Sequence, residues 1–274
     1  MSEAPAWLPI ERNESPLIVS MPHTGTDIPP ELEAKFVSPW LARKDADWWV
    51  ARLYDFASQL GATTIRTTVS RAVIDLNRDP SGRSLYPGQA TTDLCPTTTF
   101  DGEPLYRDGC QPDTAEIARR REVFFEPYHR EVKSQISRLR ERHSKIVLYE
   151  AHSIRSRIPR LFEGDLPHIN IGTNSALSCA EMLSNAVAGV CAESDFSQVT
   201  NGRFKGGYTT RHYGQPANGV HAIQVELAMR AYMNEPESPS PGNWPSRYDD
   251  ARAEPLRAIL RRILKTSLEF ASRP

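Results

Sequence analysis

The stretch KIVLYEAHS, residues 145–153, decides the fold class. It follows a charged segment that closes on Glu141, Arg142 and His143, and its apolar run has the length of a strand. Such a run after a helix is typical of a buried parallel strand in an α/β sheet. Ligands of these sheets bind beyond the carboxyl ends of the strands, where His152 would lie. The stretch therefore predicts an α/β protein with a site at His152, unless this histidine is only a polar residue that ends a strand.

A second histidine stands in the same context. The apolar residues 17–19 lead into Pro22-His23, and the glycine and prolines that follow predict a loop. Catalytic residues are often displayed on loops at strand ends. Two strand-end histidines suggest a shared metal ion.

Length and composition set the frame. The 274 residues can bury a sizeable core. With 33 basic and 34 acidic residues the chain has almost no net charge, so charge alone does not favour binding to nucleic acid or to an anionic membrane. Residues 1–16 lack the basic start and apolar core of a signal peptide, and no apolar run approaches the length of a membrane span. We expect a cytoplasmic protein that binds a small molecule, and the sequence does not indicate its oligomeric state.

The remaining periodicity predicts one domain over residues 1–274, because no repeat and no long linker divides the chain. Asp113 or Thr114 would cap a long helix, which Pro127 should kink. Gly61 would end an earlier helix. Strands are predicted at 17–21, 62–68, 71–76, 145–153, 169–172, 198–201 and 220–227, and helices at 45–61, 114–139, 175–190 and around 256–268.

Three carboxylates are candidates for a site. Asp45 and Asp47 begin the predicted helix 45–61, where acids commonly just complement the helix dipole. Near a metal ion, one of them would be the natural third ligand. Glu226 lies in the apolar strand 220–227, and a buried carboxylate is costly unless it has a partner. Glu226 is therefore a candidate functional acid.

Cations accompany these acids. Arg71 and Arg78 flank an apolar run, so both could face one pocket only if the chain bends between them. Residues 201–214 bring Arg203, Lys205 and Arg211 near a Gly-Gly turn, which suits an anion-binding loop. Arginine binds carboxylates through a planar fork, although most arginines lie in surface loops. The long segment 81–113 has no clear periodicity and should lie near the site.

Other possible ligands are weaker candidates. His129 lies within the predicted long helix, where a core histidine is more common than a metal ligand. Cys95, Cys110, Cys179 and Cys191 show no CxxC spacing, so we interpret them as reduced thiols.

Together these residues form a recognisable chemical set. Two imidazoles, one carboxylate and an open position fit a catalytic zinc ion, which activates water and polarises a carbonyl. A glutamate beside that water could take its proton and pass it to a leaving nitrogen. With arginines to hold a carboxylate, the set predicts hydrolysis of an amide bond next to a carboxylate-bearing group.

The order of the motifs also resembles a known family, the N-formylglutamate amidohydrolases, over about residues 15–235. These enzymes deformylate N-formylglutamate at the end of one route of histidine degradation. The motifs are PHTGTDIP, DADWWVARLYDF, SRAVIDLNRDPSG, YEAHS, LPHINIGTN, NGRFKGGYTTRHYG and HAIQVELAMRAYM.

The resemblance implies a three-layer α/β/α fold of phosphorylase/hydrolase type, with a mixed, mostly parallel sheet, distantly similar to zinc carboxypeptidases. It further implies a zinc ion, or another divalent transition metal, and formate and L-glutamate as products. One departure is that the carboxypeptidase pattern has a glutamate where this chain has Thr26. The implied metal ligands are His23, Asp47 (with Asp45 in reserve) and His152, the general base is Glu226, and the substrate-binding residues are Arg71, Asn77, Arg78, Arg203, Lys205 and Arg211.

Three other interpretations stay open at this stage. The chain could be a zinc enzyme of the same fold that acts on another acyl amino acid, such as N-succinylglutamate or a peptide terminus. It could be a metal-free protein that binds acyl amino acids. The polar strand ends could also be structural, with His23 and His152 more than roughly 8 Å apart, since zinc–nitrogen bonds are only about 2 Å long.

Overall fold

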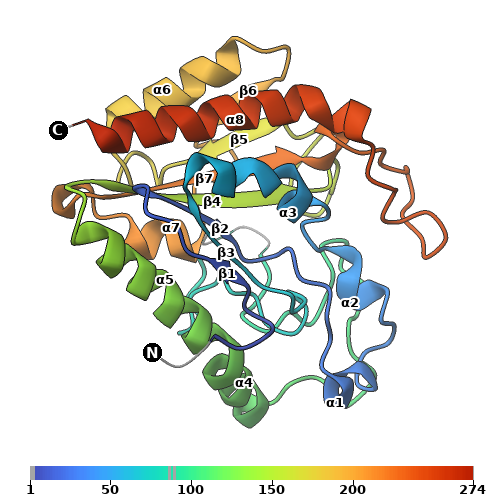
Figure 1. Cartoon of the computed structure of the whole chain (residues 1–274). Coiled ribbons are helices and arrows are strands. Elements are labelled where there is room, and N and C mark those ends of the chain that lie inside the picture. Colours follow the sequence, from blue (N-terminus) through green and yellow to red (C-terminus); the bar gives the residue numbers. More distant parts are fainter. Residues whose placement is uncertain (1–3, 86–87, 89–90, 274) are drawn as a thin grey trace.

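A seven-stranded sheet with strand order β1-β3-β2-β4-β7-β5-β6 forms the centre of the molecule (Figure 1). The computed structural model describes residues 4–85, 88 and 91–273, and all statements below concern these residues. The strands are β1 (Ile10–Glu11), β2 (Leu17–Met21), β3 (Thr63–Arg66), β4 (Ile146–Ile154), β5 (Ile169–Gly172), β6 (Gln198–Thr200) and β7 (Val220–Ala228).

Helices cover both faces of this sheet, so the predicted three-layer α/β architecture is confirmed (Figure 1). One face carries α3 (Val50–Leu53), α6 (Glu181–Ala192) and α8 (Asp250–Ser272). The other carries α4 (Thr114–Arg120), α5 (Glu126–Arg140) and α7 (Tyr208–Tyr213). The short helices α1 (Pro30–Glu33) and α2 (Leu41–Lys44) lie in the loop after β2.

The predicted central strand is β4, which is buried along its whole length. It pairs in parallel with β2 on one side and with β7 on the other. The pairs β1–β3 and β5–β7 are antiparallel, so the sheet is mixed and mostly parallel, as predicted. The chain goes from β2 to β3 on one side and later to β4 on the other, which creates a crevice at the carboxyl ends of β2 and β4.

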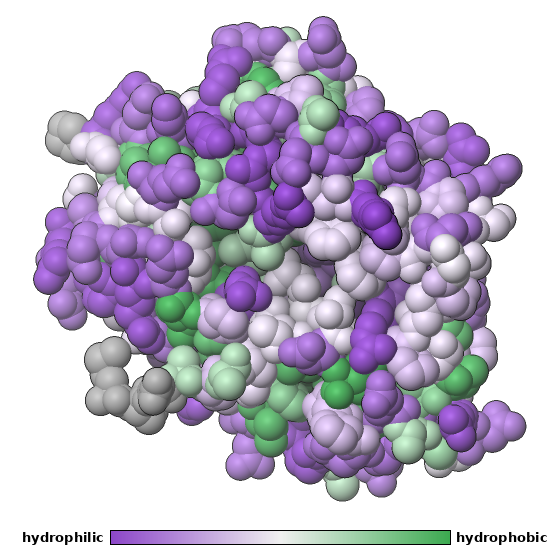
Figure 2. Space-filling model, turned by 45° about the vertical axis from the view of Figure 1, so that its right-hand side comes forward, coloured by the Kyte–Doolittle hydropathy of each residue, from purple (hydrophilic) through white to green (hydrophobic). Residues whose placement is uncertain are grey.

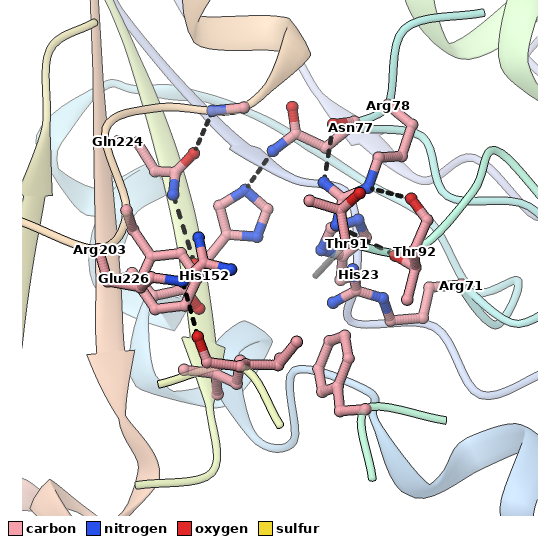
Figure 3. A pocket seen from close by; sticks show the side chains of 15 residues that line it. His23, Arg71, Asn77, Arg78, Thr91, Thr92, His152, Arg203, Gln224 and Glu226 are labelled. Carbon is pink, nitrogen blue, oxygen red and sulfur yellow. Dashed lines mark hydrogen bonds between the residues drawn. The ribbon is translucent and has the colours of Figure 1, made fainter. Parts of the chain in front are cut away.

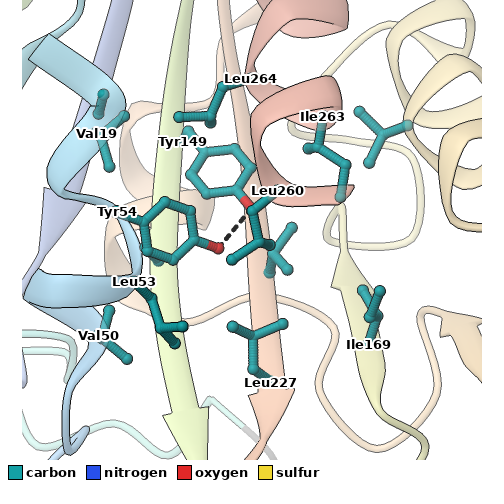
Figure 4. Close-up of a cluster of buried hydrophobic side chains, with 14 of the residues drawn as sticks. Val19, Val50, Leu53, Tyr54, Tyr149, Ile169, Leu227, Leu260, Ile263 and Leu264 are labelled. Carbon is teal, nitrogen blue, oxygen red and sulfur yellow. Dashed lines mark hydrogen bonds between the residues drawn. The ribbon is translucent and has the colours of Figure 1, made fainter. Parts of the chain in front are cut away.

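Side-chain alternation along β4 separates the core from the site. Val147 and Tyr149 point to the α8 face, where they join a large apolar cluster with Leu260 and Ile263 (Figure 4). Ile146 and Leu148 point to the opposite face. The same alternation places Glu150 and His152 on that second face, beyond the apolar residues.

Two predicted elements are wrong in detail. The segment 45–61 is not one helix: it contains α3 and, after it, a 3₁₀ helix at Asp55–Leu60. The helix does not begin at Asp45, because Trp49 adopts a left-handed backbone conformation just before α3. The run 71–76 contains turns and no strand, because its charged residues turn into the interior. This is the bend that Arg71 and Arg78 need to face one pocket.

Other boundaries shift for local reasons. The helix predicted at 175–190 begins at Glu181, because Asn174, Ser175 and Ala176 all have positive φ. Before Pro127 the long helix contains one wide π turn, Arg121–Phe125, where the expected disturbance appears. His129 on α5 is a core residue, as its context suggested, and its Nε2 donates to the carbonyl of Leu76.

Four cysteines are free thiols, as predicted. Within the described part of the chain no helix is long and apolar enough to cross a membrane. The face shown in Figure 2 is mostly hydrophilic or intermediate, with apolar residues in small separate patches.

Helix α4 fastens the loop that carries the site residues. Asp113 caps this helix by accepting from the N–H of Glu116. Arg120 is fully buried and donates to the carbonyl of Val73 and to the hydroxyl of Tyr106. Glu116 accepts from Arg119 and Arg120, and these hydrogen bonds lower the pKa of its carboxyl to about 2.

This ion cluster predicts a pH dependence of stability. Because the pKa of Glu116 is lower in the folded state, its carboxylate stabilises the fold above pH 4.5, and the contribution is lost as the pH falls from 4.5 towards 2. We expect Glu116→Gln to be destabilised at neutral pH and to approach the wild type in acid. Urea unfolding at several pH values measures the difference, and a gap that widens in acid would contradict the assignment.

Candidate active site

Three buried side chains from distant parts of the chain meet beyond the carboxyl end of the sheet. His23 follows β2, Asp47 precedes α3 and His152 lies near the end of β4, and one ligand atom from each lies within 4.8 Å of the others. The two imidazole rings are 4.8 Å apart, so the interpretation that these histidines never meet is wrong. Asp47 Oδ2 lies 3.0 Å from His152 Nδ1 and 3.8 Å from His23 Nδ1.

Unpaired polar atoms mark the centre of this group. His23 Nδ1 and Asp47 Oδ1 are buried and have no hydrogen-bond partner. Burying such atoms without a partner is costly, and two imidazoles with one carboxylate are a donor set for a catalytic transition metal. These residues therefore fit a divalent cation.

A surrounding layer of polar residues orients the histidines. Asp75 accepts from His23 Nε2 at 2.7 Å, which turns the other ring nitrogen of His23 towards Asp47. Asn77 Nδ2 lies 3.0 Å from His152 Nε2. Burial raises the pKa of the Asp75 carboxyl, but Arg78, His23 and Arg71 beside it hold this pKa well below its usual range.

Protonation differs between the two histidines. Burial and the charge of Arg71 lower the pKa of His23 to about 4, so its imidazole is neutral and able to coordinate a cation. Burial also opposes protonation of His152, but the carboxylates of Asp47 and Glu150 outweigh it and raise the pKa to about 10. The proton on His152 thus balances the charge of the Asp47 carboxylate. A metal cation at this position would balance the same charge.

Glu226 faces the same centre from β7. The β4–β7 register sets it directly opposite His152. Its carboxylate is buried and accepts from Gln224 at 3.3 Å. Burial, opposed by the charge of His152, raises the pKa of Glu226 to about 7, near the value that suits a general base at neutral pH.

A cavity of ≈ 60 Å³ opens in front of these groups. Gln224, Glu226 and Arg203 lie on one side of it, and Arg71, Arg78 and Thr92 lie on the other (Figure 3). Apolar side chains complete the wall: Phe100, Ile154, Leu161 and Phe204.

The two arginines before and after Asp75 are held firmly. Arg71 donates to Asp75 at 2.6 Å, lies 3.8 Å from Asp47 and stacks over the ring of Phe100. Arg78 donates to the carbonyl and hydroxyl of Thr92. Their guanidinium groups are therefore fixed before any substrate arrives.

Three predicted residues lie away from the cavity wall. Asp45 accepts from the N–H of Phe100 and from Arg155, so it is not part of the histidine group. Arg211 donates to the carbonyl of Gly206. Lys205 is exposed, and neither Lys205 nor Arg211 lines this cavity.

The long segment 81–113 lies at the site, as expected. Thr91, Thr92 and Phe100 line the cavity. Asp101 is bound by Lys44 and Arg155, which ties the turn carrying Phe100 to the segments that carry Asp47 and His152. Residues 86, 87, 89 and 90 of this segment lie outside the described part of the chain.

Sequence reasoning gave no role to Asp75, Glu150 or Gln224. Asp75 lies in the motif that contains Asn77 and Arg78, so its position in that motif was a usable signal. Glu150 is fully buried, and its Oε1 lies 3.5 Å from His152 Nε2. Its location two residues before His152 on the same strand face could have indicated this contact.

Comparisons with known proteins show the family of the chain. An N-formylglutamate deformylase from Pseudomonas aeruginosa is 45% identical over 96% of both chains, and one from Pseudomonas putida is 42% identical over 97% of both. The crystal structure of N-formylglutamate amidohydrolase from Ralstonia eutropha JMP134 has the same fold, with a TM-score of 0.77 at 21% identity over 97% of both chains. The family model for N-formylglutamate amidohydrolases matches residues 15–233, and the chain belongs to this family.

Proposed function

We propose that this protein is a metal-dependent enzyme that hydrolyses N-formyl-L-glutamate to formate and L-glutamate. The observation that carries the proposal is the convergence of His23, Asp47 and His152 with a buried glutamate, Glu226, at one cavity. Family membership and two relatives named as N-formylglutamate deformylases support the same substrate. A step in histidine degradation and a cytoplasmic location stay predictions from the sequence.

His23, Asp47 and His152 would hold the metal ion. A divalent cation bound there lowers the pKa of water and polarises a carbonyl group. The donor set suits zinc and also accepts iron, cobalt or manganese, so metal availability decides among them. Asp75 maintains the required orientation of His23 through the bond to its Nε2.

Glu226 would act first as base and then as acid. With a pKa of about 7, its carboxylate accepts a proton from the attacking water and returns it to the departing nitrogen. Water adds to the formyl carbon, the carbon–nitrogen bond breaks, and formate and the amine of glutamate leave.

The arginines would bind the charged parts of the substrate. N-formylglutamate has two carboxylates, and Arg71, Arg78 and Arg203 line the cavity from opposite sides. Arg71 lies 3.8 Å from Asp47, one of the three proposed metal ligands, and a guanidinium at this position also stabilises an oxyanion. Asn77 also lines the cavity and presents a side-chain amide there.

The direct test of the substrate is formate release from a panel of acyl glutamates. The proposal expects N-formylglutamate to be turned over far faster than N-acetylglutamate or N-succinylglutamate. Faster turnover of a larger acyl group would mean that the substrate of this enzyme is another acyl amino acid. Binding without turnover by metal-loaded protein would instead indicate a binding protein.

Replacing Glu226 by Gln removes the proposed base without changing the size of the side chain. We expect kcat to fall by about 10²- to 10⁴-fold while the bound metal is retained. Glu235→Gln is the matched control, because Glu235 accepts from the N–H of Ser156 and does not line the cavity. Near-normal turnover by Glu226→Gln would exclude Glu226 as the base.

Metal loss should distinguish Asp47 from its neighbour Asp45. Chelation should abolish activity, and added zinc should restore it. We expect Asp47→Asn to weaken metal binding by more than about tenfold, since losing even a group behind a ligand costs 10- to 100-fold. Asp45→Asn should keep the metal, because Asp45 contacts Phe100 and Arg155 instead. Elemental analysis after dialysis measures both, and the reverse result would contradict the ligand set.

A further inference from the structure

Gln224 is a buried polar residue that the proposed reaction does not use. It lies on β7 two residues before Glu226, so both side chains project from the same face of the strand. A primary amide has separate donor and acceptor ends, and a buried one must satisfy both. In Gln224 both ends are used at the site.

The donor end of Gln224 contacts Glu226. Its Nε2 lies 3.3 Å from Glu226 Oε2, and within the described residues this is the hydrogen bond that the carboxylate makes (Figure 3). A glutamate side chain has three rotatable bonds, so the strand alone does not fix the direction of its carboxylate. Without Gln224 the carboxylate could rotate away from the reacting water.

The acceptor end is fixed to the main chain. Gln224 Oε1 accepts from the N–H of Gly207 at 2.8 Å. Gly207 itself packs closely against Asn77: a Cβ atom at this position would lie 2.3 Å from Asn77 Nδ2. Only glycine permits this approach.

Asn77 continues the connection to the metal group. Its main-chain carbonyl accepts from Tyr208 N, and its side-chain Oδ1 accepts from Thr209 N. These bonds direct Asn77 Nδ2 to His152 Nε2. Residues 207–209 therefore connect the amide that holds Glu226 to the amide that contacts His152.

We propose that Gln224 is a positioning residue for the reaction, which holds the Glu226 carboxylate towards the water beside the metal group and anchors it to the Gly207 turn. This inference rests on the proposed function. Gln224 acts through Glu226 and does not clamp the substrate carboxylates, so its loss should reduce kcat and leave KM largely unchanged. Small displacements of a reacting group are sufficient for large losses of rate.

Gln224→Met tests the proposal, because methionine has a similar length and makes no comparable hydrogen bond. We expect kcat for formate release to fall by about 10- to 100-fold, with KM within about twofold and metal content unchanged. Gln135→Met is the matched control: Gln135 is also buried, but its bonds go to Glu131 and Arg138 on α5. This control should keep the wild-type kcat.

Gln224→Asn provides a second variant should the methionine variant fold poorly. Its shorter amide keeps the position polar but does not span the distance between Gly207 and Glu226, so the same loss of kcat is expected. Wild-type kcat in either folded variant, or a rise in KM with kcat unchanged, would overturn the proposal. Suppose that wild-type protein releases formate and Glu226→Gln does not. Wild-type activity of Gln224→Met then rejects only this inference. If wild-type protein releases no formate, the proposed function itself fails.

Discussion

The register between β4 and β7 is the constraint on which the site depends. His152 pairs with Glu226 and Glu150 pairs with Gln224, so four polar side chains project from one face of two adjacent strands. A shift of one residue in either strand would turn its polar side chains into the apolar cluster below α8. The apolar residues earlier in both strands therefore fix the register that the chemistry requires.

This arrangement concentrates charge in the interior, and the surrounding chain compensates for it. Asp47, Asp75, Glu150 and Glu226 are all buried, and isolated carboxylates cannot remain ionised there. Arg71 and the two histidines lie among them. The loop between β3 and α4 supplies Arg71 to this group, and Arg120 on α4, which is paired with Glu116, holds the loop through the carbonyl of Val73. His23 Nδ1, Asp47 Oδ1 and Glu150 Oε2 make no hydrogen bond, and the first two lie at the position proposed for the cation.

Much of the fold could be predicted because its signals are local. The apolar runs of β2, β4, β5 and β7 and the cap at Asp113 are visible in short windows of sequence, and the structure contains all of them. The helix predicted at 45–61 was wrong because tertiary contact overrides periodicity: the N–H of Asp47 donates to the carbonyl of His23, and Trp49 then reverses the backbone. The strand predicted at 71–76 was wrong because Arg71 and Asp75 are buried as an ion pair, which a propensity pattern cannot indicate.

The site was accessible to sequence reasoning to a similar degree. Strand ends and family motifs drew attention to His23, Asp47, His152 and Glu226, and the structure brings the first three into one group with Glu226 at the same cavity. The spacing of Glu150 before His152 and of Gln224 before Glu226 is visible in the sequence, but the opposition of His152 and Glu226 depends on the β4–β7 register and could not be deduced without it. An anomalous difference map from crystals grown with zinc tests the central claim most directly. The account predicts one strong peak about 2.0–2.2 Å from His23, Asp47 and His152, with Glu226 nearby and not coordinated. A peak elsewhere, or none at this group in zinc-saturated active protein, would contradict it.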